Sequence, residues 1–313
     1  MRDMEDDDWR LKTELFGDMR DWNYLEWKYF SFESQTTSGF LAFTVGNPDN
    51  ILRLKKHIIA YAFYYGEQKK IGTIVPKNSE VDLSGRNEWI FGNCSIKNQR
   101  SQRILKGEID DLKWELKFNC KAKGKRYRLL EGKKKDWMDW EILCNLANVE
   151  GSLTIGDRPI SMDGHGYYDS NYGHWLVRKY PWIWFKFMKE IDDKIMRFSL
   201  CKVRKSSKGL IVLSFDEKSF FLEDFVVEYQ KDDKTPTKYR IIGSSKDIRF
   251  EIIVEVKEID IMPVKIFKFF PLFDTRLNLL KCEFDVKIER KGNKNRFKTK
   301  GVGEYLTPVF KMF

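Results

Sequence analysis

The densest group of residues able to do chemistry is the stretch MDGHGYYDSNYGHW, residues 162–175, which holds two of the three histidines of the chain. A carboxylic acid among apolar and aromatic groups can stay protonated near neutral pH, because burial disfavours its charged form. Such an acid can protonate an alkene carbon, and aromatic faces can stabilise the cation that results. Asp169, flanked by Tyr167, Tyr168 and Tyr172, has the neighbours that this chemistry needs.

Alternation along a strand decides which of these side chains can act together. Residues two apart share a face, so Tyr167 and Asp169 point to one side and Tyr168 to the other. His165 falls on the Asp169 side, from where it can relay a proton or donate to the carboxylate, and Asn171 falls there as an orienting donor. The expected catalytic residues are therefore Asp169, Tyr167 and His165.

An aromatic run follows this motif. In KYPWIWFKFMKEI, residues 179–191, Trp182 and Trp184 share one face of a strand and apolar residues fill the other. Core packing is the ordinary role of such a run, but one face can line a ligand pocket. The residues expected to bind the substrate are Tyr168, Asn171, Tyr172, Trp140, Trp175, Trp182 and Trp184.

Three other interpretations of the motif stay open. Asp-Ser-Asn-Tyr-Gly is good turn chemistry, in which Asp and Asn side chains bond to their own backbone and Gly adopts a positive φ. His165, Asp169 and His174 can be combined into a metal site, although the sequence has no HExxH element or helical His pair. Ser170 as a nucleophile lacks the G-x-S-x-G elbow. We expect no metal ion, and a packing or capping role for His174.

The elements that position these residues are predicted to be strands, which makes the chain all-β. Apolar and polar residues alternate with a period of two, and polar turn clusters such as NPDN and RKGNKN separate the segments. The expected strands cover residues 40–48, 57–65, 88–98, 107–122, 195–205, 209–220, 225–233, 239–245, 248–259 and 279–290.

The number of strands bears on domain organisation. Roughly twenty short strands exceed what one open sheet holds comfortably, so closure into antiparallel barrels is expected. The rhythm of strands and turns indicates two successive barrel-like domains, residues 1–178 and 179–313. The MDGHGYYDSNYGHW motif then lies at their junction.

Three segments, near the start, middle and end of the chain, resemble one protein family. LEWKYFSFESQTTSGFLAFTVGNP (25–48), GHGYYDSNYGHW (164–175) and KGVGEYLTPV (300–309) are similar to the opening strand, central signature and closing strand of lipocalin-like proteins of the carotenoid 1,2-hydratase type. That group takes in the AttH-like proteins and, more distantly, tocopherol cyclase and lipocalin-like Diels–Alderases.

The resemblance implies two lipocalin-like antiparallel β-barrel domains, packed together and enclosing an apolar pocket. It implies hydration, cyclisation or isomerisation of hydrophobic polyenes without an organic cofactor. The Tyr and Asp of the Y-x-D element, here Tyr167 and Asp169, are the catalytic pair that it implies. The chain departs from the family at Lys28, where the second Trp of E-W-W-Y stands, and at His174 and Trp175, where the hydratases are more acidic.

Charge and cysteine usage bear on partners and location. The net charge is +10, and basic runs such as KGNKNRFKTK (291–300) are expected to be solvated hairpin tips, with contact to anionic lipid headgroups as the other option. The sequence has no nucleic-acid-binding motif. The five cysteines are odd in number and lack zinc spacing, so they are expected to be reduced, buried residues of an intracellular protein.

The termini and hydropathy complete this picture. The acidic amino terminus has no apolar signal-peptide region, and no stretch approaches the roughly 18 apolar residues of a transmembrane helix. We expect a cytoplasmic protein, at most peripheral at a membrane. Its expected partner is a hydrophobic small molecule, either an isoprenoid or polyene or a lipid, and not nucleic acid.

Two functions from different classes fit these residues. The first is a cofactor-independent hydratase, cyclase or isomerase that protonates an isoprenoid or polyene from a buried Asp169. The second is a lipid-binding or lipid-transfer protein with the same barrel and no chemistry, because the fold alone cannot separate the two. A β-rich scaffold for protein partners ranks last, since it leaves the acid and aromatic cluster unexplained.

Overall fold

The computed structural model describes residues 24–308, apart from 48–55, 86, 100–101, 123, 133–135, 178, 192–193, 205, 230–234 and 265–274. Its elements are strands, except for one turn of 3-10 helix, η2 (Asn78–Glu80), so the all-β prediction is confirmed. Within this described part, no helix is long and apolar enough to span a membrane. Unit 1 comprises the described residues of Met1–Arg126 and Trp140–His174, and unit 2 those of Tyr127–Asp139 and Trp175–Phe313.

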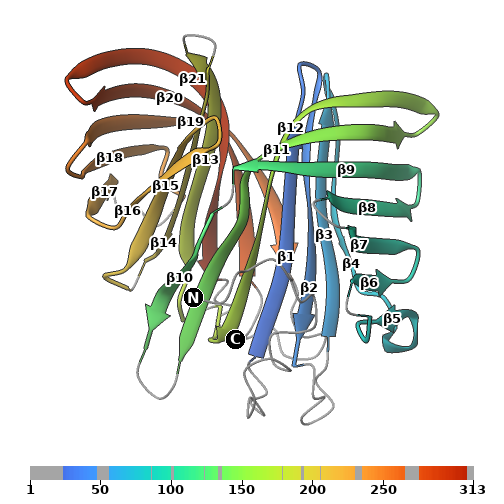
Figure 1. Cartoon of the computed structure of the whole chain (residues 1–313). Coiled ribbons are helices and arrows are strands. Elements are labelled where there is room, and N and C mark those ends of the chain that lie inside the picture. Colours follow the sequence, from blue (N-terminus) through green and yellow to red (C-terminus); the bar gives the residue numbers. More distant parts are fainter. Residues whose placement is uncertain are drawn as a thin grey trace. The chain divides into compact units, whose positions relative to one another are not determined.

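The strands of unit 1 belong to an antiparallel sheet of order β4-β3-β2-β1-β12-β11-β9-β8-β7-β6-β5; β10, whose residues from Tyr127 on are assigned to unit 2, pairs with β11. The chain meanders outward from β1, and β1 itself pairs with β12, so the sheet curls towards a barrel (Figure 1). The bounds are β1 Tyr24–Glu33, β2 Thr37–Gly46, β3 Lys56–Tyr65, β4 Gln68–Ile74, β5 Val81–Asp82, β6 Glu88–Phe91, β7 Cys94–Gln99, β8 Gln102–Ile109, β9 Leu112–Ala122, β10 Arg126–Glu131, β11 Trp137–Ile155 and β12 Arg158–His174.

Unit 2 repeats this plan in a nine-stranded antiparallel sheet of order β16-β15-β14-β13-β21-β20-β19-β18-β17. Its first strand, β13, pairs with its last, β21, as β1 does with β12 in unit 1. The bounds are β13 Trp182–Ile191, β14 Lys194–Val203, β15 Gly209–Phe215, β16 Lys218–Leu222, β17 Phe225–Tyr229, β18 Lys238–Ser244, β19 Ile248–Val264, β20 Thr275–Arg290 and β21 Asn293–Pro308.

Three segments predicted as single strands are pairs of strands joined by tight turns. Residues 88–98, 107–122 and 209–220 each contain a two-residue turn, and a residue with positive φ begins each turn. The φ angles are 59° at Gly92, 52° at Asp110 and 50° at Asp216. A two-residue turn places the residues on either side of it opposite each other on the same face, so the buried positions change from odd to even numbers across it, as from Leu105 and Ile109 to Leu112 and Trp114.

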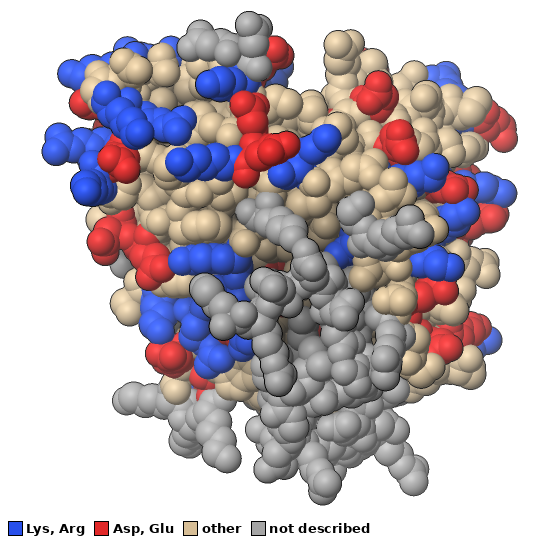
Figure 2. Space-filling view, viewed as in Figure 1, with Lys and Arg blue, Asp and Glu red and all other residues tan. Residues whose placement is uncertain are grey.

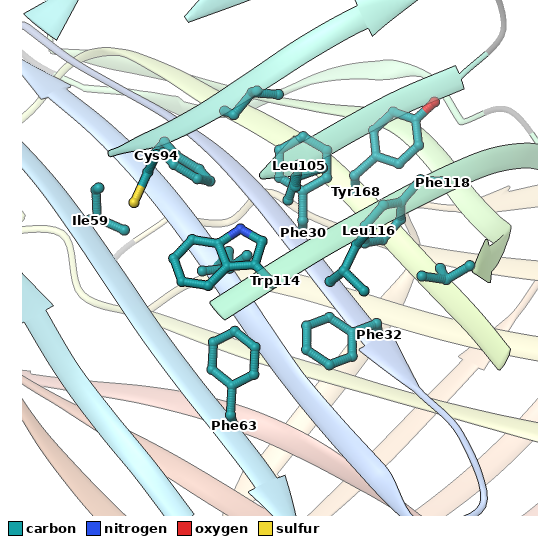
Figure 3. Packing of buried hydrophobic residues seen from close by; sticks show 14 of the residues in the cluster. Phe30, Phe32, Ile59, Phe63, Cys94, Leu105, Trp114, Leu116, Phe118 and Tyr168 are labelled. Carbon is teal, nitrogen blue, oxygen red and sulfur yellow. The ribbon is translucent and has the colours of Figure 1, made fainter. Parts of the chain in front are cut away.

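Each unit has its own hydrophobic core on the inner face of its sheet. In unit 1, Phe30, Phe32, Phe118 and Tyr168 pack around Trp114 and its aliphatic neighbours (Figure 3). In unit 2, Phe185, Phe187, Phe198 and Phe284 form the corresponding cluster. Each fully buried side chain of this size contributes roughly 1.5–3 kcal/mol, so these faces stabilise the curled sheets.

The cysteines differ from expectation in one respect. A disulfide joins Cys120 of β9 to Cys144 of β11, with 5.7 Å between their Cα atoms, so the prediction that all five cysteines are reduced is wrong for this pair. Cys94, Cys201 and Cys282 are free and buried, as predicted. The two bonded residues are 24 positions apart, and only the pairing of β9 with β11 brings them together.

Candidate active site

The central motif lies on β12, where strand alternation separates its side chains as expected. Tyr168 packs into the unit 1 core, so Tyr167, Asp169 and Asn171 lie on the opposite face of the sheet. Tyr167 and Asp169 are 0% and 3% exposed, which shows that this second face is buried too. The motif is continuous strand through His174, and the turn interpretation of Asp-Ser-Asn-Tyr-Gly is therefore wrong.

Three side chains among the described residues donate hydrogen bonds to Asp169. The Tyr167 hydroxyl donates to its Oδ2 at 2.5 Å, and the Trp140 indole Nε1–H donates to the same oxygen at 2.7 Å. The Asn171 amide Nδ2 donates to its Oδ1 at 3.2 Å. The structure therefore brings together four of the residues expected to form the site.

The identities of the three donors limit where a proton on Asp169 can go. An indole N–H only donates, and Asn171 presents its amide nitrogen, so neither group can accept a proton from the carboxyl group. A phenol hydroxyl both donates and accepts. A neutral Asp169 carboxyl group can thus share its proton only with Tyr167 among these three partners.

An aromatic wall lies beside Asp169 that the sequence did not identify. In the β1–β12 pairing, Tyr29 stands directly opposite Asp169, and Trp27 stands opposite Asn171. The Tyr29 ring stacks on Phe40 with 5.3 Å between centroids and meets Tyr167 edge-on at 6.3 Å. These aromatic rings surround the buried Asp169 carboxyl group with apolar, polarisable side chains.

The opposite, inner face of the same two strands holds a buried ion pair. The Lys28 Nζ lies 3.1 Å from Glu26 Oε1 and donates to Ser170 Oγ at 3.2 Å. The Tyr24 hydroxyl donates to Glu26 Oε2 at 2.8 Å, and the Trp89 ring lies 5.0 Å from the Lys28 ammonium. The Lys28 ammonium therefore lies on the inner face of the sheet, where it donates a hydrogen bond to Ser170.

The motif histidines do not gather around Asp169. His165 shares its face, but four residues along a strand correspond to about 13 Å, so any proton relay from His165 would pass through Tyr167. His174 lies on the other face, where its ring meets Tyr24 at 5.3 Å between centroids. Among the described residues, no group of three His, Cys, Asp or Glu side chains could hold a metal ion.

The other aromatic residues expected to bind the substrate lie in the core of unit 1 or in unit 2. Tyr172 is buried on the inner face of β12, beneath the Arg126 guanidinium at 5.4 Å. Trp175 and Trp184 are buried in unit 2. Trp182 is half-buried there and donates to Glu304 Oε2 at 3.3 Å. Trp182 and Trp184 alternate with the core residues Ile183 and Phe185, so they face away from the unit 2 core.

A glycine of the motif has a packing role. A Cβ atom on Gly166 would lie 2.4 Å from Val149 Cγ2 and 2.6 Å from a ring carbon of Phe118. Only glycine therefore lets Val149 and Phe118 reach this part of β12, just before the site residues.

Sequence reasoning missed Tyr29, Phe40 and the Lys28–Glu26 pair with Ser170. The signal for Tyr29 was its alternation with Phe30 in LEWKYFSF, which places it away from the core. The alternation alone does not predict that Tyr29 lies near Asp169, because the register of β1 against β12 decides which residues stand opposite each other.

No protein-family model and no curated protein matches the chain. Solved structures match it at low identity. One is the crystal structure of a protein provisionally assigned as AttH from Nitrosomonas europaea, with a TM-score of 0.55 and 12% identity over 94% of this chain and 95% of that chain. Another, CghA with Sch210972, has a TM-score of 0.59 and 11% identity over 91% of this chain and 88% of that chain. This likeness concerns the fold, and the prediction of two lipocalin-like antiparallel barrels is confirmed.

Proposed function

We propose that the protein is a cofactor-independent hydratase, cyclase or isomerase of a hydrophobic isoprenoid or polyene, with Asp169 and Tyr167 as the proton-transfer pair. The observation that carries this proposal is a buried carboxyl group with three donor neighbours, of which only Tyr167 can also accept a proton. Because a phenol hydroxyl both donates and accepts, Tyr167 can pass a proton from Asp169 to a substrate.

The proposed first step moves two protons together. Tyr167 gives its hydroxyl proton to an alkene carbon, so that a C–H bond forms, the π bond breaks and a carbocation remains on the substrate. With Asp169 protonated, the hydrogen bond between the two oxygens, 2.5 Å apart, runs from the carboxyl group to Tyr167, and the carboxyl proton moves to the Tyr167 oxygen at the same time. Asp169 is left as a carboxylate.

The neighbours of Asp169 favour this step. The N–H groups of Trp140 and Asn171 stabilise the carboxylate once its proton has gone. The faces of Tyr29 and Phe40 provide cation–π attraction, worth about 2 kcal/mol when desolvated. In hydration, water adds to the cation and returns one proton to Asp169. In isomerisation, a carbon next to the cation loses its proton to Asp169 and a new C=C bond forms. In cyclisation, a second C=C bond of the substrate first attacks the cation to form a C–C bond, and the new cation then loses a proton to Asp169.

The test is turnover of a panel of prenyl chains and polyenes, followed by mass spectrometry. A gain of one water would identify a hydratase, and an isomer of equal mass a cyclase or isomerase. Asp169→Asn is expected to keep the fold and to lose turnover by about 100-fold or more, the usual scale for loss of a general acid.

Asp163→Asn is the matched control, because Asp163 is exposed on the same strand and is expected to leave turnover unchanged. Unchanged product formation in Asp169→Asn would refute the proposal. If a bound lipid is recovered unaltered from the wild-type protein and no substrate in the panel reacts, the protein is a carrier instead.

A further inference from the structure

The outward face of β21 carries a row of basic side chains. Lys294, Arg296, Lys298 and Lys300 alternate along the strand, and all four are exposed. The residues of β20 that face the core are Cys282, Phe284, Val286 and Ile288, and the basic residues stand opposite the alternate, outward positions of that strand. At about 3.4 Å per residue the row extends for roughly 20 Å.

On β20 the acids Glu289, Asp285 and Glu283 stand opposite Lys294, Lys298 and Lys300, and two of these acids form their ion pairs with other basic residues. The acids on neighbouring strands bind other cations: Asp285 binds Arg296 at 2.8 Å, and Glu283 binds Lys257 at 3.3 Å. Over the ranges that the structure describes, no ion pair joins Lys294, Lys298 or Lys300 to an acid. Figure 2 shows Lys and Arg side chains gathered at the upper left, over the end of the β20–β21 hairpin.

An open groove of about 1090 Å³ adjoins the row and shares Lys294 and Arg296 with it. Five apolar side chains line the groove, namely Phe225, Val226, Ile242, Phe250 and Ile288. Val226 is 55% exposed, which is unusual for an aliphatic side chain. Asp224, Glu251 and Glu289 also line it, and Glu251 is bound by Arg240 and Lys287 at 2.8 Å each. The surface therefore combines an apolar hollow with exposed lysines that form no ion pair within the described residues.

We propose that this face of unit 2, the β21 row with its groove, docks on an anionic phospholipid bilayer. Lysines are attracted to the negative potential of such a surface, and an apolar groove beside them suits the boundary between headgroups and acyl chains. A nucleic acid is disfavoured, because binding of single strands uses exposed aromatic rings for stacking, and the aromatic of this strand, Phe297, packs against the core. The proposal goes beyond the Asp169 chemistry and does not depend on it.

Co-sedimentation with vesicles tests this surface. The wild-type protein is expected to bind vesicles of phosphatidylcholine with phosphatidylserine, and not vesicles of phosphatidylcholine alone. Each lysine near an anionic surface contributes roughly fivefold to binding, so the triple variant K294Q/K298Q/K300Q is expected to bind about 100-fold more weakly. Binding should also fall as salt shortens the screening length from about 10 Å at 0.1 M to about 3 Å at 1 M.

The matched control is K77Q/K97Q/K121Q, which removes as many positive charges from exposed lysines of unit 1. An equal loss in this control would mean that overall charge, and not the β21 row, drives binding, and would overturn the proposal. Failure to bind anionic vesicles, or preferential binding of a DNA duplex through the same lysines, would overturn it as well. Asp169→Asn should bind vesicles like the wild type, so failure of the catalytic proposal leaves this result unaffected.

Discussion

Asp169 and Ser170 are neighbours in the chain and face opposite sides of the same strand pair. Asp169 is held by neutral donors among aromatic rings, and Ser170 is a ligand of the Lys28 ammonium. Both are at most 3% exposed. Because both faces of β12 are buried here, two separate polar clusters share one strand, and each can be tested by its own substitutions.

Trp140→Phe tests whether the hydrogen bond that Trp140 donates to Asp169 contributes to turnover. The change removes the N–H that reaches Asp169 Oδ2 at 2.7 Å and keeps an aromatic ring. A hydrogen bond to a charged group contributes about 1.5–3 kcal/mol, so turnover is expected to fall on the order of 10–100-fold while the protein stays folded. The measurement is steady-state turnover of the substrate that the panel identifies.

Trp114→Phe is the control for this substitution. Its indole Nε1 is buried and has no hydrogen-bond partner among the described residues, so Trp114→Phe removes no hydrogen bond. The smaller ring leaves a cavity that should destabilise the core without affecting turnover. If Trp140→Phe were as active as Trp114→Phe, the Trp140 hydrogen bond would have no part in the reaction.

Lys28→Met tests the inner cluster. Removing one partner of a buried ion pair leaves the other charge uncompensated, and this typically costs about 3–5 kcal/mol. Chemical denaturation should show that loss, and E26Q/K28M should recover most of it because neither charge remains. The surface pair Lys70–Asp111, with 2.8 Å between the charged atoms and side chains 43% and 48% exposed, is the comparison. Lys70→Met should cost far less than Lys28→Met, because water screens the exposed pair; equal costs for the two lysines would contradict our account of the buried pair.

At the scale of elements, β11 connects the disulfide to the candidate active site. Cys144 is bonded to Cys120 on β9, and Trp140, four residues earlier on β11, donates to Asp169 on β12. The register of β9 against β11 shifts between Leu146 and Ala147, close to the disulfide. The crosslink therefore secures β11 near an irregular pairing and near a residue of the site.

Reduction of this disulfide is expected to destabilise unit 1. Closing a loop of 24 residues corresponds to about 3 kcal/mol in the chain-entropy description. Denaturation with and without a thiol reductant should show a loss of this size, and the variant C120A/C144A should be insensitive to the reductant. A wild-type protein whose stability is the same under both conditions would show that the crosslink is absent or without effect.

At the scale of the whole molecule, two curled sheets of the same plan each bury free thiols in their cores. Burial raises the pKa of Cys94 in unit 1 to about 11 and that of Cys282 in unit 2 to about 12, from the usual 9.0. Burial also raises the pKa of the Tyr239 hydroxyl in unit 2. These groups stay neutral in the folded protein at pH values where the unfolded chain ionises.

The sign of the resulting pH dependence follows from these pKa values. The thiols contribute stability that is fully present below pH 9 and is lost as the pH rises towards about 11 and 12. The denaturation midpoint should therefore fall over this range, and C94A/C282A should show a shallower fall. Iodoacetamide at pH 9 should label these thiols slowly in the native protein and rapidly in denaturant. Rapid native labelling would contradict their burial.

Local alternation determined much of this protein in advance. The period-two pattern identified the strands and the all-β class, and it placed Tyr167, Asp169 and Asn171 on one face of β12. It succeeded because the two faces of a strand alternate regardless of what the strand pairs with. The turns at Gly92, Asp110 and Asp216 lie where the buried positions change from odd to even numbers, a change of phase that the single predicted strands 88–98, 107–122 and 209–220 ran across.

Only the tertiary structure decided which residues meet across strands. The register of β1 against β12 sets Tyr29 opposite Asp169 and lets Lys28 reach Ser170, 142 positions away. The folding of β11 brings Trp140 to Asp169, and its pairing with β9 brings Cys144 to Cys120. Strand register is a long-range choice made by the packing of whole faces, and no short stretch of sequence carries it.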